Sequence, residues 1–169
     1  LPGLFPPVRI GDRYFVDGAL IKTLHASVAL QEGADLLICI NPLVPFDSRL
    51  AADRPPRATP APSHLVEGGL PVVLSQTFRA IIHSRMRTGM DRYRHEFEGR
   101  DVVLFEPTRD DADMFFTNVF SYRGRSRLCE HAYQRTRSDL YPRRHELRPI
   151  FARHGIELDL GVLKDHSLS

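Results

Sequence analysis

Tyr14-Phe15-Val16-Asp17-Gly18-Ala19 is the stretch from which the fold is predicted, together with the apolar run Leu36-Leu37-Ile38-Cys39-Ile40 behind it. In the first stretch, residues that favour strands lead to a carboxylate and a glycine, which predicts a strand ending at Asp17-Gly18. A strand interior would leave that carboxylate without a partner. Asp17 is therefore the main candidate for a catalytic residue, although Asp-Gly is also a common turn dipeptide.

A hairpin is predicted immediately before Asp17. Two β-rich runs, residues 8–10 and 13–16, flank the dipeptide Gly11-Asp12. A two-residue Gly-Asp loop between such runs is a strong hairpin signal. The second arm of this hairpin would deliver Asp17 to the end of a rigid strand.

A helix and a second strand are predicted after Asp17. Apolar residues at helical spacing predict a helix over 24–32, with Thr23 as its N-cap and Gly33 directly after its last turn. The uninterrupted apolar run 36–40 predicts a strand buried on both faces, as in a parallel sheet. Strand, helix and buried strand in this order predict an α/β fold.

Residues 42–69 form a proline-rich stretch, and residues 70–98 predict a long amphipathic helix. The proline-rich stretch predicts a mobile or lid-like loop, or a plain surface linker. The helix could be interrupted at Gly89. Its apolar residues form a stripe along one face, and such a stripe most often packs in the core. The stripe consists of Leu70, Leu74, Phe78, Ile81, Ile82, Met86, Met90, Tyr93 and Phe97, and the polar face of Arg79, Arg85, Arg87, Arg92 and Arg94.

The remaining residues predict one strand and several helices. A short buried strand is expected near 102–106, and an acidic turn or N-cap at 110–113. A calcium loop is excluded there by the ligand spacing. Residues 122–148 are rich in arginine and predict helices, the last opening near Pro142 and stopping at Gly155. This segment is either a solvated helix face or a contact with an anionic membrane surface.

Composition predicts one soluble globular domain. The chain has 169 residues, of which 42% are hydrophobic and 26% charged, and its net charge of +2 is too small to indicate nucleic acid as a partner. Two isolated cysteines exclude a disulfide framework and fit a cytoplasmic location. No apolar run is long enough for a membrane span, so only peripheral membrane contact is expected. The opening residues Leu1-Pro2-Gly3 are typical of a segment from a larger protein.

The ordered motifs of the first forty residues resemble the patatin-like phospholipase family. They are Pro2-Gly3-x-Phe5-Pro6-Pro7, the hairpin Gly11-x-x-Tyr14-x-x-Asp17-Gly18, a helix, and Gly33-Ala34-Asp35 before a strand. The resemblance implies a mostly parallel sheet flanked by helices, with a helical C-terminal extension. Residues 1–41 would be the C-terminal part of the catalytic core, 42–69 a loop, and 70–169 the completion of the same domain. Lys22-Thr23-Leu24-His25 stands where the family commonly has Asn-Pro.

The resemblance assigns Asp17 the role of general base in a Ser-Asp dyad, in Asp17-Gly18-Ala19. The parent protein would be a carboxylic ester hydrolase acting on phospholipids or other acyl esters, without metal or cofactor. No serine of the chain lies in a G-x-S-x-G pattern, so the nucleophile is expected upstream of Leu1. The chain alone would then be inactive.

Two alternatives compete with this interpretation. The chain could be a noncatalytic lipid-binding or partner-binding module that docks through the helix around 70–97 and the arginine-rich segment. It could instead belong to a Ser-Asp-His hydrolase in which Asp17 orients a later histidine such as His83. The eight histidines show no metal-ligand spacing.

Overall fold

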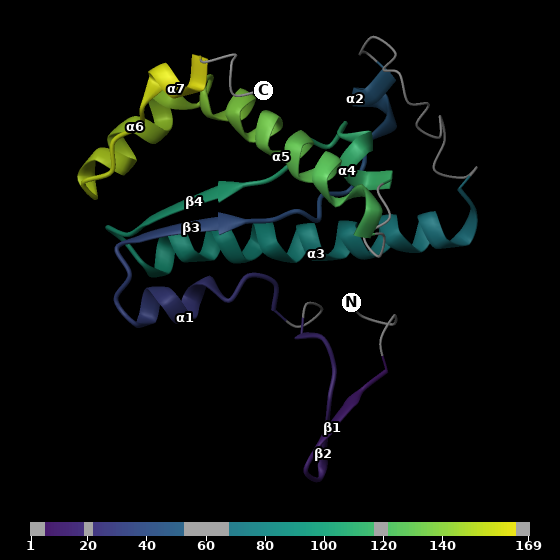
Figure 1. Ribbon diagram of the computed structural model, residues 1–169. Helices are drawn as coiled ribbons and strands as arrows, with labels where there is room; N and C mark the ends of the chain where they lie inside the picture. The colour runs from purple at the N-terminus through teal and green to yellow at the C-terminus, as the bar shows by residue number, and fades with distance from the viewer. Residues whose placement is uncertain (1–5, 19–21, 53–67, 117–121, 165–169) are drawn as a thin grey trace.

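The computed structural model describes residues 6–18, 22–52, 68–116 and 122–164 (Figure 1). A short hairpin is followed by a mixed helical and strand region that holds the core. The elements are β1 (Val8–Ile10), β2 (Arg13–Phe15), α1 (Ala26–Gln31), β3 (Leu36–Ile40), α2 (Ser48–Ala52), α3 (Gly69–Glu96), β4 (Asp101–Phe105), α4 (Ala112–Phe116), the 3₁₀ turn η2 (Tyr122–Gly124), α5 (Arg125–Leu140), α6 (Arg144–Arg153) and α7 (Leu160–Lys164).

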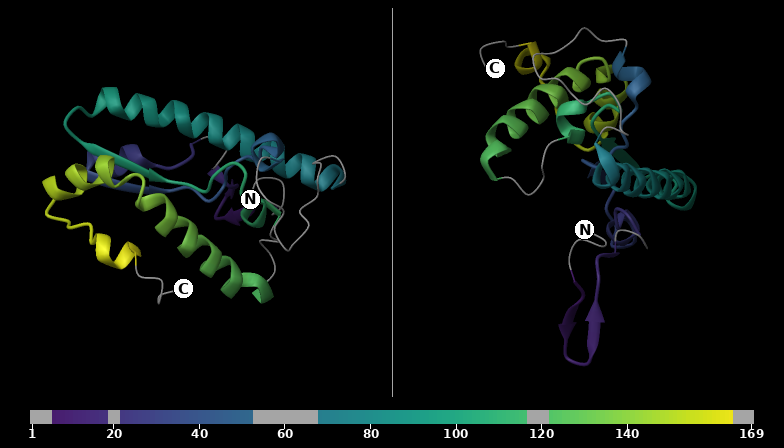
Figure 2. Two further views of the ribbon diagram at one scale, coloured as in Figure 1. Left: turned by 90° about the horizontal axis from the view of Figure 1, so that it is seen from above. Right: turned by 90° about the vertical axis from the view of Figure 1, so that its right-hand side faces the viewer.

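The β1–β2 hairpin projects away from the rest of the molecule (Figures 1 and 2). Its strands are antiparallel with Val8 opposite Phe15, and Gly11 takes a φ of +62° in the turn, as a Gly-Asp loop requires. The prediction that the second arm continues to Asp17 is wrong, because β2 ends at Phe15. The next residue would have to pair with Pro7, which has no N–H to donate to the ladder.

The α/β class is confirmed by the unit β3–α3–β4. Strands β3 and β4 lie parallel, with Leu36 opposite Asp101 and Ile40 opposite Phe105, and α3 is in the connection between them. Parallel neighbours need such a crossover, usually a helix. The strand predicted near 102–106 is therefore confirmed as β4.

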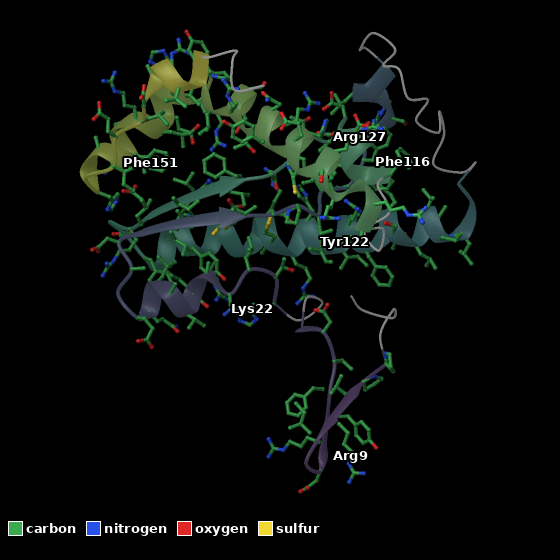
Figure 3. The ribbon with its side chains drawn as sticks, in the orientation of Figure 1. Arg9, Lys22, Phe116, Tyr122, Arg127 and Phe151 are labelled. Atoms are coloured by element: carbon green, nitrogen blue, oxygen red, sulfur yellow. The ribbon has the colours of Figure 1, made fainter. Side chains whose placement is uncertain are left out.

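Helices pack on both faces of this sheet, so successive strand residues enter two different clusters. On the face of α1 and α3, Cys39 packs with Met86, Met90 and Tyr93. On the opposite face, Val103 packs with Leu147 and Phe151 of α6, and Phe151 is labelled in Figure 3. Burial raises the pKa of the Cys39 thiol, which keeps this group neutral inside the core.

The prediction that the strand at 36–40 is buried on both faces is wrong. Ile38 and Ile40 are 48% and 70% exposed. Ile38 and Ile40 lie on the face of the sheet that packs against α6. Helix α6 covers β4 around Val103 on this face and leaves Ile38 and Ile40 of β3 uncovered. Among the described residues, β3 has one strand neighbour, β4, so the sheet is narrower than the apolar run suggests.

Helix α1 confirms one predicted cap and corrects the other. Gly33 follows the helix with a φ of +97°, as predicted. The N-cap residue is His25 and not Thr23. Leu24 has a φ of +52°, which breaks the helical conformation just before that position, and its carbonyl accepts a hydrogen bond from Tyr93 Oη at 3.4 Å.

Helix α3 is continuous through Gly89 and is buried along its second half. Ile82, Met86, Met90 and Tyr93 are buried as predicted, whereas Leu70, Leu74 and Ile81 are exposed and Arg79 is buried. A helix of 28 residues is about 42 Å long and a five-residue strand only about 17 Å, so the sheet cannot cover the first half of α3. Within the described residues, no helix is long and apolar enough to cross a bilayer.

The proline-rich stretch begins with buried residues. Residues 41–47 are irregular, as a loop is, but Val44 and Phe46 are each only 5% exposed, so this part is not a surface linker. The prediction of a loop is wrong for Ser48–Ala52, which form α2. Gln76 of α3 holds the segment: its Nε2 donates to Phe46 O at 2.7 Å, and its Oε1 accepts from Phe46 N at 2.9 Å. Residues 53–67, on which the prediction of a lid mainly falls, lie outside the described residues.

The arginine-rich segment is helical, as predicted, with α5 followed by α6. Helix α6 begins at Arg144, so Pro142 lies in the turn before it and does not open it. Gly155 follows the helix with a φ of +71°, which confirms the predicted stop. An acidic N-cap is also confirmed, because Asp111 Oδ1 accepts a hydrogen bond from Met114 N at 3.1 Å at the start of α4.

Replacing Leu147 with Ala is expected to destabilise the protein by about 3 kcal/mol, because the side chain is fully buried between α6 and the sheet and its removal leaves a cavity. The measurement is the urea-unfolding free energy. Leu70→Ala is the matched control, since Leu70 is exposed on α3 and its loss should cost well under about 1 kcal/mol. Equal losses for the two variants would refute this arrangement of the core.

Candidate functional site

Asp17 lies at the surface in the irregular segment that joins the hairpin to α1. Next to it along the chain, Lys22 N donates to Gly18 O at 3.0 Å. Lys22 in turn bonds Ser27 Oγ of α1 through its Nζ, which ties this segment to the helix. Asp17 itself is exposed to solvent. Gly18 is exposed as well.

A second group of polar residues lies at the carboxyl ends of the two parallel strands. Asn41 follows β3 directly and Glu106 follows β4, and Asn41 Nδ2 donates to Glu106 Oε2 at 3.2 Å. His83, on α3, places its Nε2 at 3.5 Å from Glu106 Oε1. We refer to Asn41, His83 and Glu106 as the strand-end cluster. In α/β sheets, ligands most often bind at this edge.

The strand-end cluster is held rigidly. Asn41 is buried, its N donates to Phe105 O at 2.9 Å, and its Oδ1 accepts from Leu43 N at 3.1 Å. The carboxylate of Glu106 therefore has one partner for each oxygen, the amide of Asn41 and the ring of His83. A carboxylate that orients an imidazole is an arrangement used in acid–base catalysis, and it is also common as a purely structural contact.

This geometry bears on the Ser-Asp-His alternative. That alternative has Asp17 orient His83, whereas the carboxylate that lies beside His83 in the structure is that of Glu106, with Oε1 at 3.5 Å from His83 Nε2. The sequence indicates His83 as a candidate, but not Glu106 or Asn41. A signal was present, because both residues directly follow the two apolar strands at residues 36–40 and 101–105.

Asp111, His131 and Arg135 form a third group, which we call the α4–α5 clamp. Both oxygens of Asp111 lie 2.8 Å from His131 Nε2, and Arg135 Nε donates to Oδ2 at 3.2 Å. Burial by itself would raise the pKa of Asp111. The hydrogen bonds from His131 and from the backbone of Met114, with the charges of His131 and Arg135, outweigh burial and hold the pKa below its usual value.

Two residues of the α4–α5 clamp, Asp111 and His131, form a candidate metal-ligand set with Asp113. Oxygen and nitrogen atoms of Asp111, Asp113 and His131 lie within 4.8 Å of one another. The same carboxylates, however, already have cationic partners: Arg135 at 3.2 Å from Asp111 and Arg127 at 3.3 Å from Asp113. Arg127 is labelled in Figure 3. This charge arrangement fits a structural link between two helices better than a metal centre.

Many arginines of the segment 122–148 have partners within the chain. Arg143 Nη1 bonds Asp139 Oδ2 at 2.9 Å, and the guanidinium groups of Arg125 and Arg144 stack on the rings of Tyr122 and Tyr141, with 3.5 and 4.4 Å from Cζ to the ring centroid. These contacts favour the interpretation of a solvated, internally paired surface over that of an anionic-membrane contact.

Comparison of the chain with protein-family models, with curated proteins and with solved structures gives no match. The assignment of Asp17 as a general base therefore depends on the ordered motifs around it and on the position that the fold gives it.

Proposed function

We propose that this chain is part of a patatin-like lipid acyl hydrolase in which Asp17 is the general base of a Ser-Asp dyad. The observation that carries the proposal is the position of Asp17. Its exposed carboxylate follows a hairpin and precedes a helix and a parallel strand, β3, the order in which the family presents its aspartate. The two-stranded parallel sheet with helices on both faces would be part of the family's larger sandwich.

The chemistry of the dyad needs a fixed carboxylate beside a serine hydroxyl. The serine attacks the acyl carbon as Asp17 takes its proton, and backbone N–H groups hold the negative charge on the acyl oxygen. A carboxylate of ordinary pKa is a weak base, so such a site works by orientation and by loss of water when the partner segment covers Asp17. Water then completes hydrolysis of the acyl-serine.

The nucleophile in this proposal is a serine outside the 169 residues, because no serine of the sequence stands between glycines in the G-x-S-x-G pattern. The substrates would be glycerophospholipids, lysophospholipids or other acyl esters. The reaction requires no metal ion.

Labelling with a fluorophosphonate tests the proposal directly, since this reagent forms a covalent bond with activated serines. In the natural gene product we expect one labelled serine in a G-x-S-x-G pattern, together with hydrolysis of p-nitrophenyl butyrate. The control is the 169-residue chain expressed alone, which should remain unlabelled. Absence of labelling in the gene product, or labelling of a serine within these residues, would contradict the proposal.

A noncatalytic lipid-binding module is the second candidate, and the surface of α3 favours it. Leu70, Val73, Leu74 and Ile81 are exposed along the half of the helix that extends beyond the sheet. An apolar helix surface of this kind suits a membrane interface or a partner helix. Binding of the gene product to phospholipid vesicles without fluorophosphonate labelling would select this candidate.

A further inference from the structure

Arg79 of α3 is unusual because it is a buried arginine without a carboxylate partner among the described residues. It is only 7% exposed, although helical periodicity places it on the polar face of α3. An arginine keeps its charge at any physiological pH, and a buried guanidinium is normally paired with a carboxylate. Burial of such a charge without a counter-charge is strongly destabilising.

No carboxylate among the described residues forms an ion pair with Arg79. Its hydrogen-bond partner there is the carbonyl oxygen of Val44, at 3.5 Å from Nη1, and its Cζ lies 4.8 Å from the ring centroid of Phe115. Burial lowers the pKa of Arg79, and no acidic group opposes that effect. Among the described residues, this carbonyl is the one hydrogen-bond acceptor of the guanidinium, which carries five N–H donors.

The surroundings of Arg79 combine this cation with an aromatic wall. Phe46 contacts both Phe115 and Phe116, with ring centroids 5.4 and 5.3 Å apart, and Phe116 is labelled in Figure 3. The segment carrying Val44 and Phe46 follows β3, and the helix carrying the other two rings follows β4. Arg79 also precedes His83 of the strand-end cluster by one helical turn. The group therefore lies near the edge of the sheet where ligands bind in α/β folds.

We infer that Arg79 binds an oxyanion, a carboxylate or a phosphate group, that is attached to an apolar chain packing against Phe46, Phe115 and Phe116. The planar guanidinium accepts either group through two parallel hydrogen bonds. The aromatic rings bury the adjoining hydrocarbon. The inference does not involve Asp17 and stands without the proposed hydrolase activity.

Binding of octanoate, octyl phosphate and the neutral probe octanol to the full chain, measured by calorimetry, tests the inference. We expect at least one of the two anions to bind at least tenfold more tightly than octanol, and the tighter anion identifies the head group. Arg79→Met should weaken anion binding tenfold or more and leave octanol binding unchanged. Arg87→Met is the matched control, because Arg87 is exposed on the same helix, and its effect should stay within twofold.

Stability separates a binding role from a structural one. Without a ligand, Arg79→Met should have a melting temperature equal to or above that of the original chain, because a buried unpaired charge is replaced by an apolar side chain of similar length. Arg79→Lys keeps the charge but lacks the planar guanidinium that donates two parallel hydrogen bonds. This variant should therefore bind the anion about tenfold more weakly. Equal affinity of octanol and both anions for the original chain, unchanged anion affinity in these variants, or a lower melting temperature of Arg79→Met would overturn the inference.

Discussion

Asp17→Asn is expected to lower kcat for acyl-ester hydrolysis by roughly 10²- to 10⁴-fold, which is the usual contribution of a general base. Asparagine has the same shape as aspartate but cannot take the serine proton during attack. Substrate contacts stay in place, so KM should remain within about twofold of its original value. The measurement is the steady-state hydrolysis of p-nitrophenyl butyrate and of a phospholipid in mixed micelles by the natural gene product.

Asp12→Asn is the control for this variant. Like Asp17, Asp12 is an exposed aspartate with a glycine neighbour. It follows Gly11 and lies in the hairpin turn. Its replacement removes the same charge from the hairpin turn instead of the segment after the hairpin, and it should leave kcat unchanged. Vesicle binding should be equal in both variants. A hydrolase that retains its activity with asparagine at position 17 would rule out the dyad, whatever the identity of the nucleophile.

The elements of the fold could be predicted where the signal is local. The Gly11-Asp12 turn, Gly33 and Gly155 each take the positive φ or turn position that their sequence context indicates. The apolar run at 36–40 and its counterpart before Pro107 are both strands. Such signals come from backbone sterics and from short-range periodicity, which need no knowledge of the rest of the chain.

The extent of burial could not be predicted, because it depends on which segments cover an element. Arg79 is buried because the segment with Val44 and Phe46 folds against α3. Ile38 and Ile40 are exposed because α6 covers the β4 side of the sheet. In both cases the local pattern gives the correct secondary structure and the wrong exposure.

The residues of the candidate site also differ in whether local sequence or only the folded structure identifies them. Asp17 could be named from a short motif. The strand-end cluster joins residues 41, 83 and 106, and its assembly requires the parallel pairing of β3 with β4 and the packing of α3 beneath them. Sequence spacing alone gives no reason to associate His83 with Glu106. Parallel strands make such distant residues neighbours at one edge, which is why their carboxyl ends are the positions to inspect first.

Asp111→Ala is expected to destabilise the protein by about 4 kcal/mol, because it breaks a buried charge pair and removes a helix cap together. The Asp111 side chain is only 2% exposed, and its loss would leave His131 and Arg135 of α5 without their shared carboxylate. The measurement is the urea-unfolding free energy at pH 7. Asp91→Asn is the control, since the Asp91–Arg94 pair is exposed and should contribute less than about 1 kcal/mol.

The same carboxylate should make stability depend on pH. The pKa of Asp111 is lower in the folded protein than the value of about 3.9 expected in the unfolded chain. Between these two values the unfolded chain binds more protons, so the unfolding free energy rises with pH. The contribution of Asp111 is complete above the unfolded pKa and is lost as the pH falls through the folded one. Urea midpoints measured from pH 2.5 to 7 should therefore fall less steeply on acidification in Asp111→Ala than in the original chain, and parallel curves would show that the clamp does not stabilise the ionised carboxylate.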